Sequence, residues 1–418
     1  MTNNNELKVQ ANKEKDVGDK KKMRQAFQDF EGGLFSCVEK ADVGDSYSKM
    51  AEQGVDLMGW ADPFAPDFVL PEHILQATRT AIEEAIAAHY TAPLGNSELK
   101  AALANKLRHF NNLQVNPERN ILITPGSDSG LYYAMLTFLN EGDEVLIPSP
   151  AYPNFFQNCK IMAAKAIPVQ LKAELEFQID IADLEAALTS KTKMLVLAQP
   201  NNPTTTVFNR QTIKELCEFV IKHDLILVCD QAFEDFTFEN ELLSPASFPG
   251  MMSRTISVFS VSKGLGLSGY RVGYIVADAV YINAMMGAVV SVLGTTNTVA
   301  QKAVIAALAD LSYLGDFEKE FDIRRKAAYA IINSIPNVSC QMPQSGFLAW
   351  VDVSKLGNSA TIVAYLAAEA KVAVNDGSNY GPGGEGHIRI VLGVYRDTER
   401  VIAALNRIKD ALISYQNK

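Results

Sequence analysis

The chain alternates short apolar runs with stretches of helical periodicity from about residue 70 onwards. Seven runs are apolar at nearly every position, and they occupy residues 120–124, 144–148, 165–171, 193–198, 225–230, 255–260 and 270–277. Between most of them, apolar residues recur every three or four positions, which is the spacing of one helix face. Strands that are apolar on both sides must be covered on both faces. The pattern predicts an α/β domain with a mostly parallel seven-stranded sheet flanked by helices.

Two helices are predicted ahead of the first apolar run. Residues 70–90 and 96–110 both carry apolar side chains at helical spacing. Asn96 or Ser97 is placed to cap the second of these helices, because a short polar side chain can accept hydrogen bonds from the free N–H groups of the first turn.

The pattern changes in the last third of the chain. Helical patterns at 299–311 and 359–371 flank the strand-like segments 346–353 and 387–392. This mixture predicts a smaller α+β domain that the N-terminal segment joins. We therefore divide the chain into residues 1–70 (an N-terminal arm and part of the small domain), 71–300 (a large ligand-binding domain) and 301–418 (the C-terminal small domain). Residues 1–30 are charged and are expected to form a flexible arm or a solvated helix.

Charge and cysteine usage exclude several classes of protein. The 418 residues carry a formal net charge of −10, which disfavours nucleic acid or an anionic membrane as the partner. No apolar run is long enough to span a membrane, and the polar start lacks a secretory signal core. The five cysteines are dispersed without a CxxC pair, which favours a reducing cytoplasm over a disulfide framework or a metal site.

The candidate functional residues follow the ends of the predicted strands, and this is the edge at which open parallel sheets bind ligands. A turn with the sequence PGSDSG leads into a helix, Asp230 ends an apolar run, and Lys263 follows another. Each has an ordinary alternative: a capped turn, a surface or N-cap carboxylate, and a solvated lysine. Arg271 follows eight residues after Lys263 and can offer a planar fork to a phosphate. Pyridoxal phosphate would use all four features, since it carries a phosphate, a protonated ring nitrogen and an aldehyde.

The segment around Lys263 also resembles a known family. Ser260, Ser262 and Lys263, followed by Arg271 and Gly273, are similar to the Schiff-base lysine signature of the class I/II aminotransferases, which have the pyridoxal-phosphate fold type I. The resemblance covers about residues 55–395, with further motifs in the family's order. It implies that Lys263 binds the cofactor aldehyde, that Arg271 binds its phosphate and that Ser260 is a cofactor-binding residue.

Three of these further motifs surround the cofactor ring in the family. The resemblance makes Asn202, in QPNNPTT, the donor to the cofactor's phenolic oxygen and a substrate contact. It makes Asp230, in DQAF, the partner of the pyridinium nitrogen. Tyr152, in PSPAYP, stands where the family stacks an aromatic side chain on the ring.

Other motifs concern the phosphate and the substrate. Ser127 and Asp128 match the phosphate-cradling turn, and Tyr90 stands where a tyrosine reaches the phosphate of the partner subunit. The resemblance therefore implies a homodimer with shared active sites. Arg389 stands where the family binds the substrate α-carboxylate, and Gly59 or Trp60, in the substrate loop, is a candidate substrate contact.

The sequence departs from the family pattern at several places. Phe233 replaces the usual tyrosine that donates to the cofactor, and Thr205 replaces a glycine of the Asn-Pro-Thr-Gly turn. The substrate loop at 56–73 carries extra residues, and Asn375, Asp376 and Gly377 stand where Pro-Gly is common. These differences concern the substrate class rather than the central constellation.

The resemblance implies an aminotransferase that moves an amino group from an L-amino acid to a 2-oxo acid through a Lys263 Schiff base. The same fold and lysine also serve carbon–sulfur lyases, decarboxylases and cyclopropane-forming synthases. A non-catalytic member, or the ligand sensor of a transcription regulator, is a further alternative. The sensor is disfavoured because only about 50–70 residues precede the fold, with no clear helix-turn-helix pattern.

Overall fold

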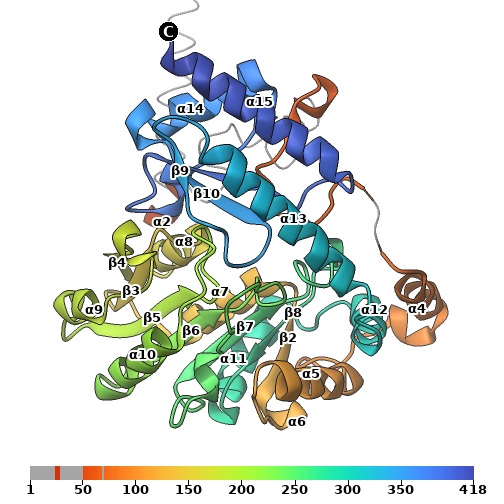
Figure 1. The fold of residues 1–418 in the computed structure, drawn as a ribbon. Helices are drawn as coiled ribbons and strands as arrows, with labels where there is room; N and C mark the ends of the chain where they lie inside the picture. Colours follow the sequence, from red (N-terminus) through yellow and green to blue (C-terminus); the bar gives the residue numbers. More distant parts are fainter. Residues whose placement is uncertain (1–23, 29–49, 68–69) are drawn as a thin grey trace, which may run out of the picture.

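The computed structural model describes residues 24–28, 50–67 and 70–418 (Figure 1). Most of the predicted N-terminal arm, and Cys37, lie outside the described residues. In chain order the helices are α2 (Gln25–Gln28), α4 (Glu72–Glu83), α5 (Ser97–Phe110), α6 (Pro117–Asn120), α7 (Ser127–Phe138), α8 (Pro153–Ile161), α9 (Ile181–Ala187), α10 (Arg210–Lys222), α11 (Ala279–Val292), α12 (Thr298–Ala309), α13 (Leu314–Ile332), α14 (Ser359–Tyr365) and α15 (Thr398–Gln416). The strands are β1 (Asp56–Leu57), β2 (Ile121–Thr124), β3 (Glu144–Ser149), β4 (Lys165–Gln170), β5 (Thr192–Ala198), β6 (Ile226–Asp230), β7 (Thr255–Ser260), β8 (Gly273–Val276), β9 (Ser339–Cys340), β10 (Leu348–Asp352), β11 (Val372–Ala373), β12 (Asn375–Asp376) and β13 (His387–Val391).

Each of the seven predicted apolar runs forms a strand of one sheet, so the predicted fold class is confirmed. The strand order is β2-β8-β7-β6-β5-β3-β4. Neighbouring strands are parallel except at β8, which runs antiparallel to both β2 and β7. Parallel strands need a crossover connection, usually a helix. Only a short segment with a single 3₁₀ turn, Ser268–Tyr270, joins β7 to β8, and the chain therefore returns in the opposite direction.

Helices cover both faces of this sheet, as the apolar strands require. On one face, α7, α8 and α11 bury their apolar residues against alternate positions of the strands. On the other face, α9 and α10 cover one half of the sheet, while α5 and α12 cover the half that contains β2 and β8. The predicted capping of α5 is confirmed, because the side chain of Asn96 accepts hydrogen bonds from the N–H groups of Glu98 and Leu99. Among the described residues, no helix is long and apolar enough to cross a membrane.

The C-terminal part forms a second layer structure above the first (Figure 1). Strands β12, β13, β10 and β9 form an antiparallel sheet in that order. Helices α13 and α15 pack together and bury a core with this sheet. The predicted strand-like segments at 346–353 and 387–392 correspond to β10 and β13.

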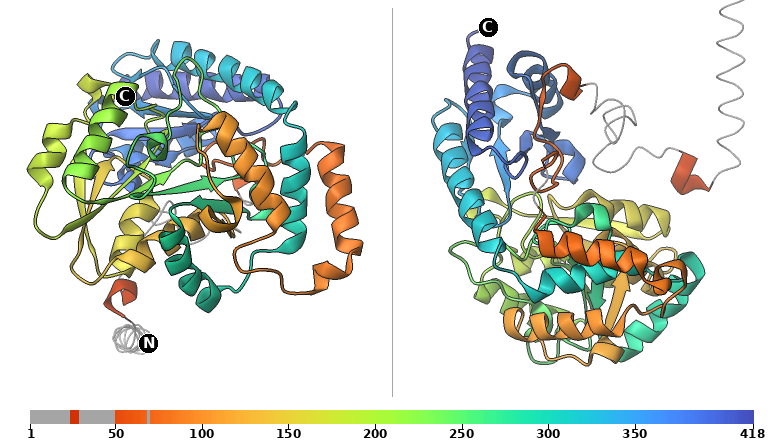
Figure 2. Two further views of the ribbon diagram at one scale, coloured as in Figure 1. Left: turned by 90° about the horizontal axis from the view of Figure 1, so that it is seen from below. Right: turned by 90° about the vertical axis from the view of Figure 1, so that its right-hand side faces the viewer.

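The segment 50–67 lies beside the C-terminal part, although it precedes the large sheet in sequence. Figure 1 shows its red-orange start beside the blue helix α15, and the right-hand view of Figure 2 shows it beside the blue C-terminal part. Strand β1 pairs in parallel with β11, and Asp56 forms ion pairs with Arg400 and Arg407 of α15. This segment reaches the boundary between the two sheets, where the candidate site lies.

Candidate functional site

A cavity of about 420 Å³ lies at the edge of the large sheet where β5, β6 and β7 end. Eleven of the twelve sequence-predicted site residues line it, which are Gly59, Ser127, Asp128, Tyr152, Asn202, Asp230, Phe233, Ser260, Lys263, Arg271 and Arg389. Its wall also includes Trp60, Ala61, Asp62, Ala232, Ser262, Ser268 and Gly269. Segments separated by more than 300 residues therefore meet in one concave site.

The register of the strands brings the polar turns together. Gly273, at the start of β8, pairs with Thr124 on one side and with Ser260 on the other. Because β8 is antiparallel, its beginning lies beside the ends of β2 and β7. The turn before β8, which carries Arg271, therefore lies at the same edge as the turns that carry Ser127 and Lys263.

The start of α7 and the Arg271 turn form a close-fitting anion cradle. A Cβ atom on Gly126 would lie 2.3 Å from the Arg271 guanidinium, and one on Gly273 would lie 2.7 Å from the backbone nitrogen of Ser127. Gly273 therefore has no room for a side chain beside the backbone, and Gly126, with a φ of 87°, has a backbone conformation that favours glycine. Gly126 caps α7 without a side-chain hydrogen bond, and Ser127 and Asp128, in the first turn of the helix, line the cavity, so the positive end of the helix dipole lies at this wall. Arg271 itself has a left-handed backbone, with φ of 52°.

Lys263 places its amine within this cavity. Burial lowers the pKa of the amine to about 8, and the carboxylate of Asp62 opposes this shift. The amine donates a hydrogen bond to the carbonyl oxygen of Ala61. An amine with this pKa is neutral in about a tenth of the molecules at pH 7, far more often than an ordinary solvated lysine, and the neutral form is the nucleophile.

Asp230 ends β6 with a carboxylate that faces the same cavity. Burial raises the pKa of this carboxyl to about 7, opposed by a hydrogen bond from the Ala232 N–H, 3.0 Å away. Asp230 forms no ion pair with another described residue. A buried carboxylate of this kind is stabilised by a cationic or proton-donating group that enters the cavity.

Tyr152 and Asp128 form a hydrogen-bonded pair on one wall of the cavity. The Tyr152 hydroxyl donates to Asp128 Oδ1 at 2.9 Å, and the amide of Asn154 donates to the same oxygen at 2.9 Å. Burial raises the pKa of Tyr152 well above its usual value, and the Asp128 carboxylate adds to this effect. The carboxylate of Asp128 therefore fixes the tyrosine ring.

Arg389 is almost fully buried, yet the side-chain and backbone groups that it bonds to are neutral oxygens. Its guanidinium donates to Oδ1 of Asn375 at 2.6 Å, to Oδ1 of Asn202 at 3.2 Å and to the carbonyl oxygen of Gly59 at 2.9 Å. Across residues 24–28, 50–67 and 70–418 it forms no ion pair. The charge of this arginine, 1% exposed, is thus held in place at the cavity wall without an anion, and an entering carboxylate would neutralise it.

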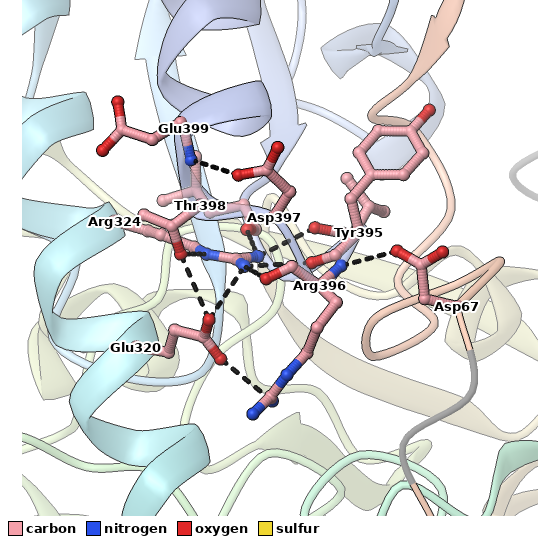
Figure 3. Close-up of polar contacts among 10 residues, drawn as sticks. Asp67, Glu320, Arg324, Tyr395, Arg396, Asp397, Thr398 and Glu399 are labelled. Atoms are coloured by element: carbon pink, nitrogen blue, oxygen red, sulfur yellow. Dashed lines mark hydrogen bonds and ion pairs between the residues drawn. The ribbon is translucent and has the colours of Figure 1, made fainter.

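A buried arginine of α13 anchors the loop that follows the Arg389 strand (Figure 3). The Arg324 guanidinium donates to four backbone carbonyl oxygens of this loop, on Leu392, Val394, Tyr395 and Arg396, at 2.8–3.3 Å. The loop in turn holds the segment that borders the cavity. Asp67 accepts a hydrogen bond from the Arg396 N–H at 2.7 Å, and the Tyr395 N–H donates to the Ala65 carbonyl at 3.0 Å. This network fixes the position of the cavity-lining residues of that segment.

Tyr90 is the predicted site residue that does not line the cavity. Its side chain is 94% exposed, and it follows the 3₁₀ turn Ala85–Ala88. The sequence reasoning missed Asp62, Ser268 and Ala61, and it named Trp60 only as an uncertain substrate contact. These residues lie in irregular segments without apolar periodicity, so the local pattern gives no signal for them.

The two departures at Phe233 and Thr205 have clear structural settings. The Phe233 ring packs against Phe347, and its centroid lies 5.8 Å from the Lys263 amine. Thr205 has a φ of 64°, in the left-handed region that favours glycine. Its carbonyl accepts from the Ser345 hydroxyl at 2.8 Å and its N–H donates to Asn201 at 2.9 Å. These bonds hold a conformation that costs a β-branched residue about 1–3 kcal/mol.

Comparison with known proteins gives one consistent result. Residues 62–408 match the family described as Aminotransferase class I and II. An aspartate aminotransferase of Musicola paradisiaca is 32% identical over 381 residues, which cover 89% of this chain and 93% of that protein. The aromatic-amino-acid aminotransferase 2 of Thermococcus litoralis is 30% identical over 354 residues, covering 83% and 90%. The crystal structure of an aromatic aminotransferase from Pyrococcus horikoshii has a TM-score of 0.83 and 29% identity, covering 88% of this chain and 99% of that chain.

Proposed function

This chain belongs to the aminotransferase class I and II family and is a pyridoxal-phosphate-dependent aminotransferase, and we propose that Lys263 is its catalytic lysine. The observation that carries the proposal is the Lys263 amine, whose pKa burial lowers to about 8, in the same cavity as Asp230 and two arginines. We propose that the reaction moves an amino group from an L-amino acid to a 2-oxo acid.

The residues of the cavity fit pyridoxal phosphate. A phosphate suits the cradle formed by the start of α7, the Ser260 hydroxyl and the Arg271 guanidinium, where a Cβ on Gly126 or Gly273 would leave no room. A ring nitrogen that carries a proton suits the unpaired carboxyl of Asp230. The side-chain oxygen of Asn202 accepts a hydrogen bond from Arg389. The side-chain N–H groups of Asn202 are therefore the ones that can donate to the cofactor's phenolic oxygen.

When bound, pyridoxal phosphate supplies an aldehyde and an electron-withdrawing ring that stabilises negative charge at Cα of the amino acid. Lys263 would hold this aldehyde through its amine, and the same amine, when free, would take the proton from Cα of the amino acid. Asp230 would keep the proton on the ring nitrogen, and Tyr152, oriented by Asp128, would contact the ring. Arg389 binds the α-carboxylate and orients the Cα–H bond toward the lysine.

We further propose that the active form is a homodimer in which Tyr90 contacts the partner's phosphate. The Thr91 hydroxyl lies 3.2 Å from those of Thr295 and Thr298, which brings Tyr90 beside the end of α11. Exposed apolar side chains lie on α4, on the 3₁₀ turn before Tyr90 and at the end of α11, namely Ile82, Ile86, Val290, Val292 and Leu293. A second copy of the chain would bury them.

A cytoplasmic location is also part of the proposal. Four cysteines, Cys159, Cys217, Cys229 and Cys340, are buried and form no disulfide. Free thiols are typical of proteins that function in a reducing compartment.

Borohydride reduction of the holoenzyme tests the assignment of Lys263. Reduction should attach the cofactor to the peptide that contains Lys263, as located by mass spectrometry. The Lys263→Ala variant should bind the cofactor without covalent attachment, whereas Lys172→Ala, which removes a surface ion pair with Asp183, should be labelled as the unmodified protein is. Labelling of another lysine would refute the assignment.

Product analysis tests the reaction type. Mixing the holoenzyme with an amino acid should yield one equivalent of the matching 2-oxo acid without a second substrate, and a different 2-oxo acid should restore the original absorbance. Release of carbon dioxide or sulfide instead would identify a decarboxylase or a lyase.

A further inference from the structure

The cationic side chains that line the cavity all have a role in the proposed function, whereas one of its carboxylates has none. Its cationic residues are Lys263, Arg271 and Arg389, and the proposed function assigns each of them to the cofactor or to the α-carboxylate of the substrate. No cation of the described lining is therefore left for a second carboxylate on the substrate side chain.

One carboxylate of the cavity wall has no role in binding the cofactor. Asp230 faces the ring nitrogen, and Asp128 accepts hydrogen bonds from Tyr152 and Asn154. Asp62, which the sequence reasoning did not single out, also lines the cavity. It forms no ion pair with the described residues, although its charge lies close enough to the Lys263 amine to oppose the lowering of that amine's pKa.

The carboxylate of Asp62 is held at the cavity wall. Its Oδ1 accepts a hydrogen bond from the Ser268 hydroxyl at 2.5 Å. The segment that carries it is fixed on its far side, where the Phe64 N–H donates to the Gly393 carbonyl at 2.6 Å and Asp67 accepts from the Arg396 N–H (Figure 3). Asp62 is thus a rigidly placed charge rather than a side chain on a free loop.

The substrate side chain must lie close to this charge. Arg389 donates to the carbonyl oxygen of Gly59, and Lys263 donates to that of Ala61. An amino acid whose carboxylate is bound by Arg389 and whose amino group faces Lys263 therefore lies alongside residues 59–62. Trp60 and Asp62 belong to the lining of the same cavity, and we expect the substrate side chain to extend from Cα toward them.

We infer that Asp62 selects against amino acids with a second carboxylate, so that the side chain of the preferred substrate is neutral or positively charged. This inference rests on the proposed transamination at Lys263. The relatives have names that include both aspartate and aromatic aminotransferases, and a charge in the side-chain part of the site distinguishes these two classes of substrate. Like charges separated by about 8 Å in a partly buried site change a relative rate by about ten- to thirtyfold.

The test compares kcat/KM for aspartate, alanine and arginine in the holoenzyme and in two variants. Asp62→Asn keeps the shape and the hydrogen bond from Ser268 but removes the charge. It should raise the aspartate-to-alanine ratio by about ten- to thirtyfold and lower the arginine-to-alanine ratio. Ratios cancel any effect of Asp62 on the reactivity of Lys263. Asp316→Asn, which removes an exposed carboxylate of α13 that pairs with Lys319 outside the cavity, is the control and should leave both ratios unchanged.

Binding measurements provide a second readout that does not depend on turnover. Dissociation constants of succinate and butyrate, followed by the absorbance of the holoenzyme, should favour butyrate, and Asp62→Asn should reduce this preference by a similar factor. If the wild type prefers aspartate and succinate, and Asp62→Asn changes neither preference, the inference is wrong. Absence of transamination with every amino acid would contradict the proposed function, while the succinate and butyrate constants would still decide the role of the charge.

Discussion

Replacing Arg389 with glutamine is expected to weaken substrate binding without a large loss of stability. The side chain is buried in the native protein, but its partners are the neutral oxygens of Asn375, Asn202 and Gly59 at the cavity wall. Glutamine retains one amide donor for these acceptors, and water in the cavity can reach the others. The positive charge, in contrast, has no substitute.

The magnitude follows from this geometry. Truncating one partner of a buried, hydrogen-bonded charge pair costs roughly 2–5 kcal/mol. The open cavity admits solvent, which favours the lower part of that range, and we expect about 2–3 kcal/mol. This corresponds to a dissociation constant raised about thirty- to two-hundredfold for a monocarboxylate such as butyrate.

Arg325 offers a matched control on α13. Its side chain is also buried, but it pairs with Asp322 at 2.6 Å and donates to the Pro343 carbonyl at 3.0 Å, away from the cavity. Arg325→Gln should therefore destabilise the protein by about 1–3 kcal/mol and leave the dissociation constant unchanged.

Two measurements separate these effects. Absorbance titration of the holoenzyme with butyrate gives the dissociation constant, and urea unfolding gives the stability of each variant. Cofactor affinity should be the same in all three proteins. The reasoning fails if Arg389→Gln binds butyrate as the wild type does, or if it loses cofactor and butyrate affinity in equal measure.

Three further predictions concern the cofactor and the subunit contact. In protein freed of cofactor, burial raises the pKa of Asp230 from 3.8 in the unfolded chain to about 7 in the folded protein, so the free energy of unfolding should fall as pH rises from about 4 through 7. The Asp230→Asn variant should not show this fall. Urea unfolding should therefore give a difference between the two proteins of up to about 4 kcal/mol at pH 8. A parallel decline in both proteins would rule out Asp230 as the cause. Inactive Lys263→Ala and Tyr90→Ala subunits, mixed in equal amounts, should recover about a quarter of the wild-type activity, because half of the dimers are hybrids with one intact site; no recovery despite subunit exchange would contradict a shared site. Phe233→Tyr should lower the pH midpoint of the holoenzyme's visible absorbance change by about one to two units, because the new hydroxyl would donate to the cofactor's phenolic oxygen and stabilise the negative charge of that oxygen. An unchanged midpoint would show that the side chain at position 233 does not reach that oxygen.

The local sequence determined the large sheet and most of the residues at its edge. Strands buried on both faces must be apolar at every position, and this requirement makes each of the seven runs visible without any knowledge of its neighbours. The residues that end those runs, such as Asp230 and Ser260, then lie at one edge because parallel strands end together. Lys263 and Asn202 follow the same rule, since each comes within a few residues of a strand end.

The tertiary structure alone decided how the remaining parts reach that edge. The antiparallel direction of β8 brings Arg271 beside the turn at Ser127, and this direction depends on pairing between strands that are far apart in sequence. The position of Asp62 depends on backbone bonds to the loop after β13, which Arg324 fixes from a third element. Irregular segments carry no hydrophobic period, because their positions are set by hydrogen bonds to distant residues and not by a buried face of their own. For the same reason, the neutral partners of Arg389 became apparent only when the two sheets and the segment at Gly59 were seen together.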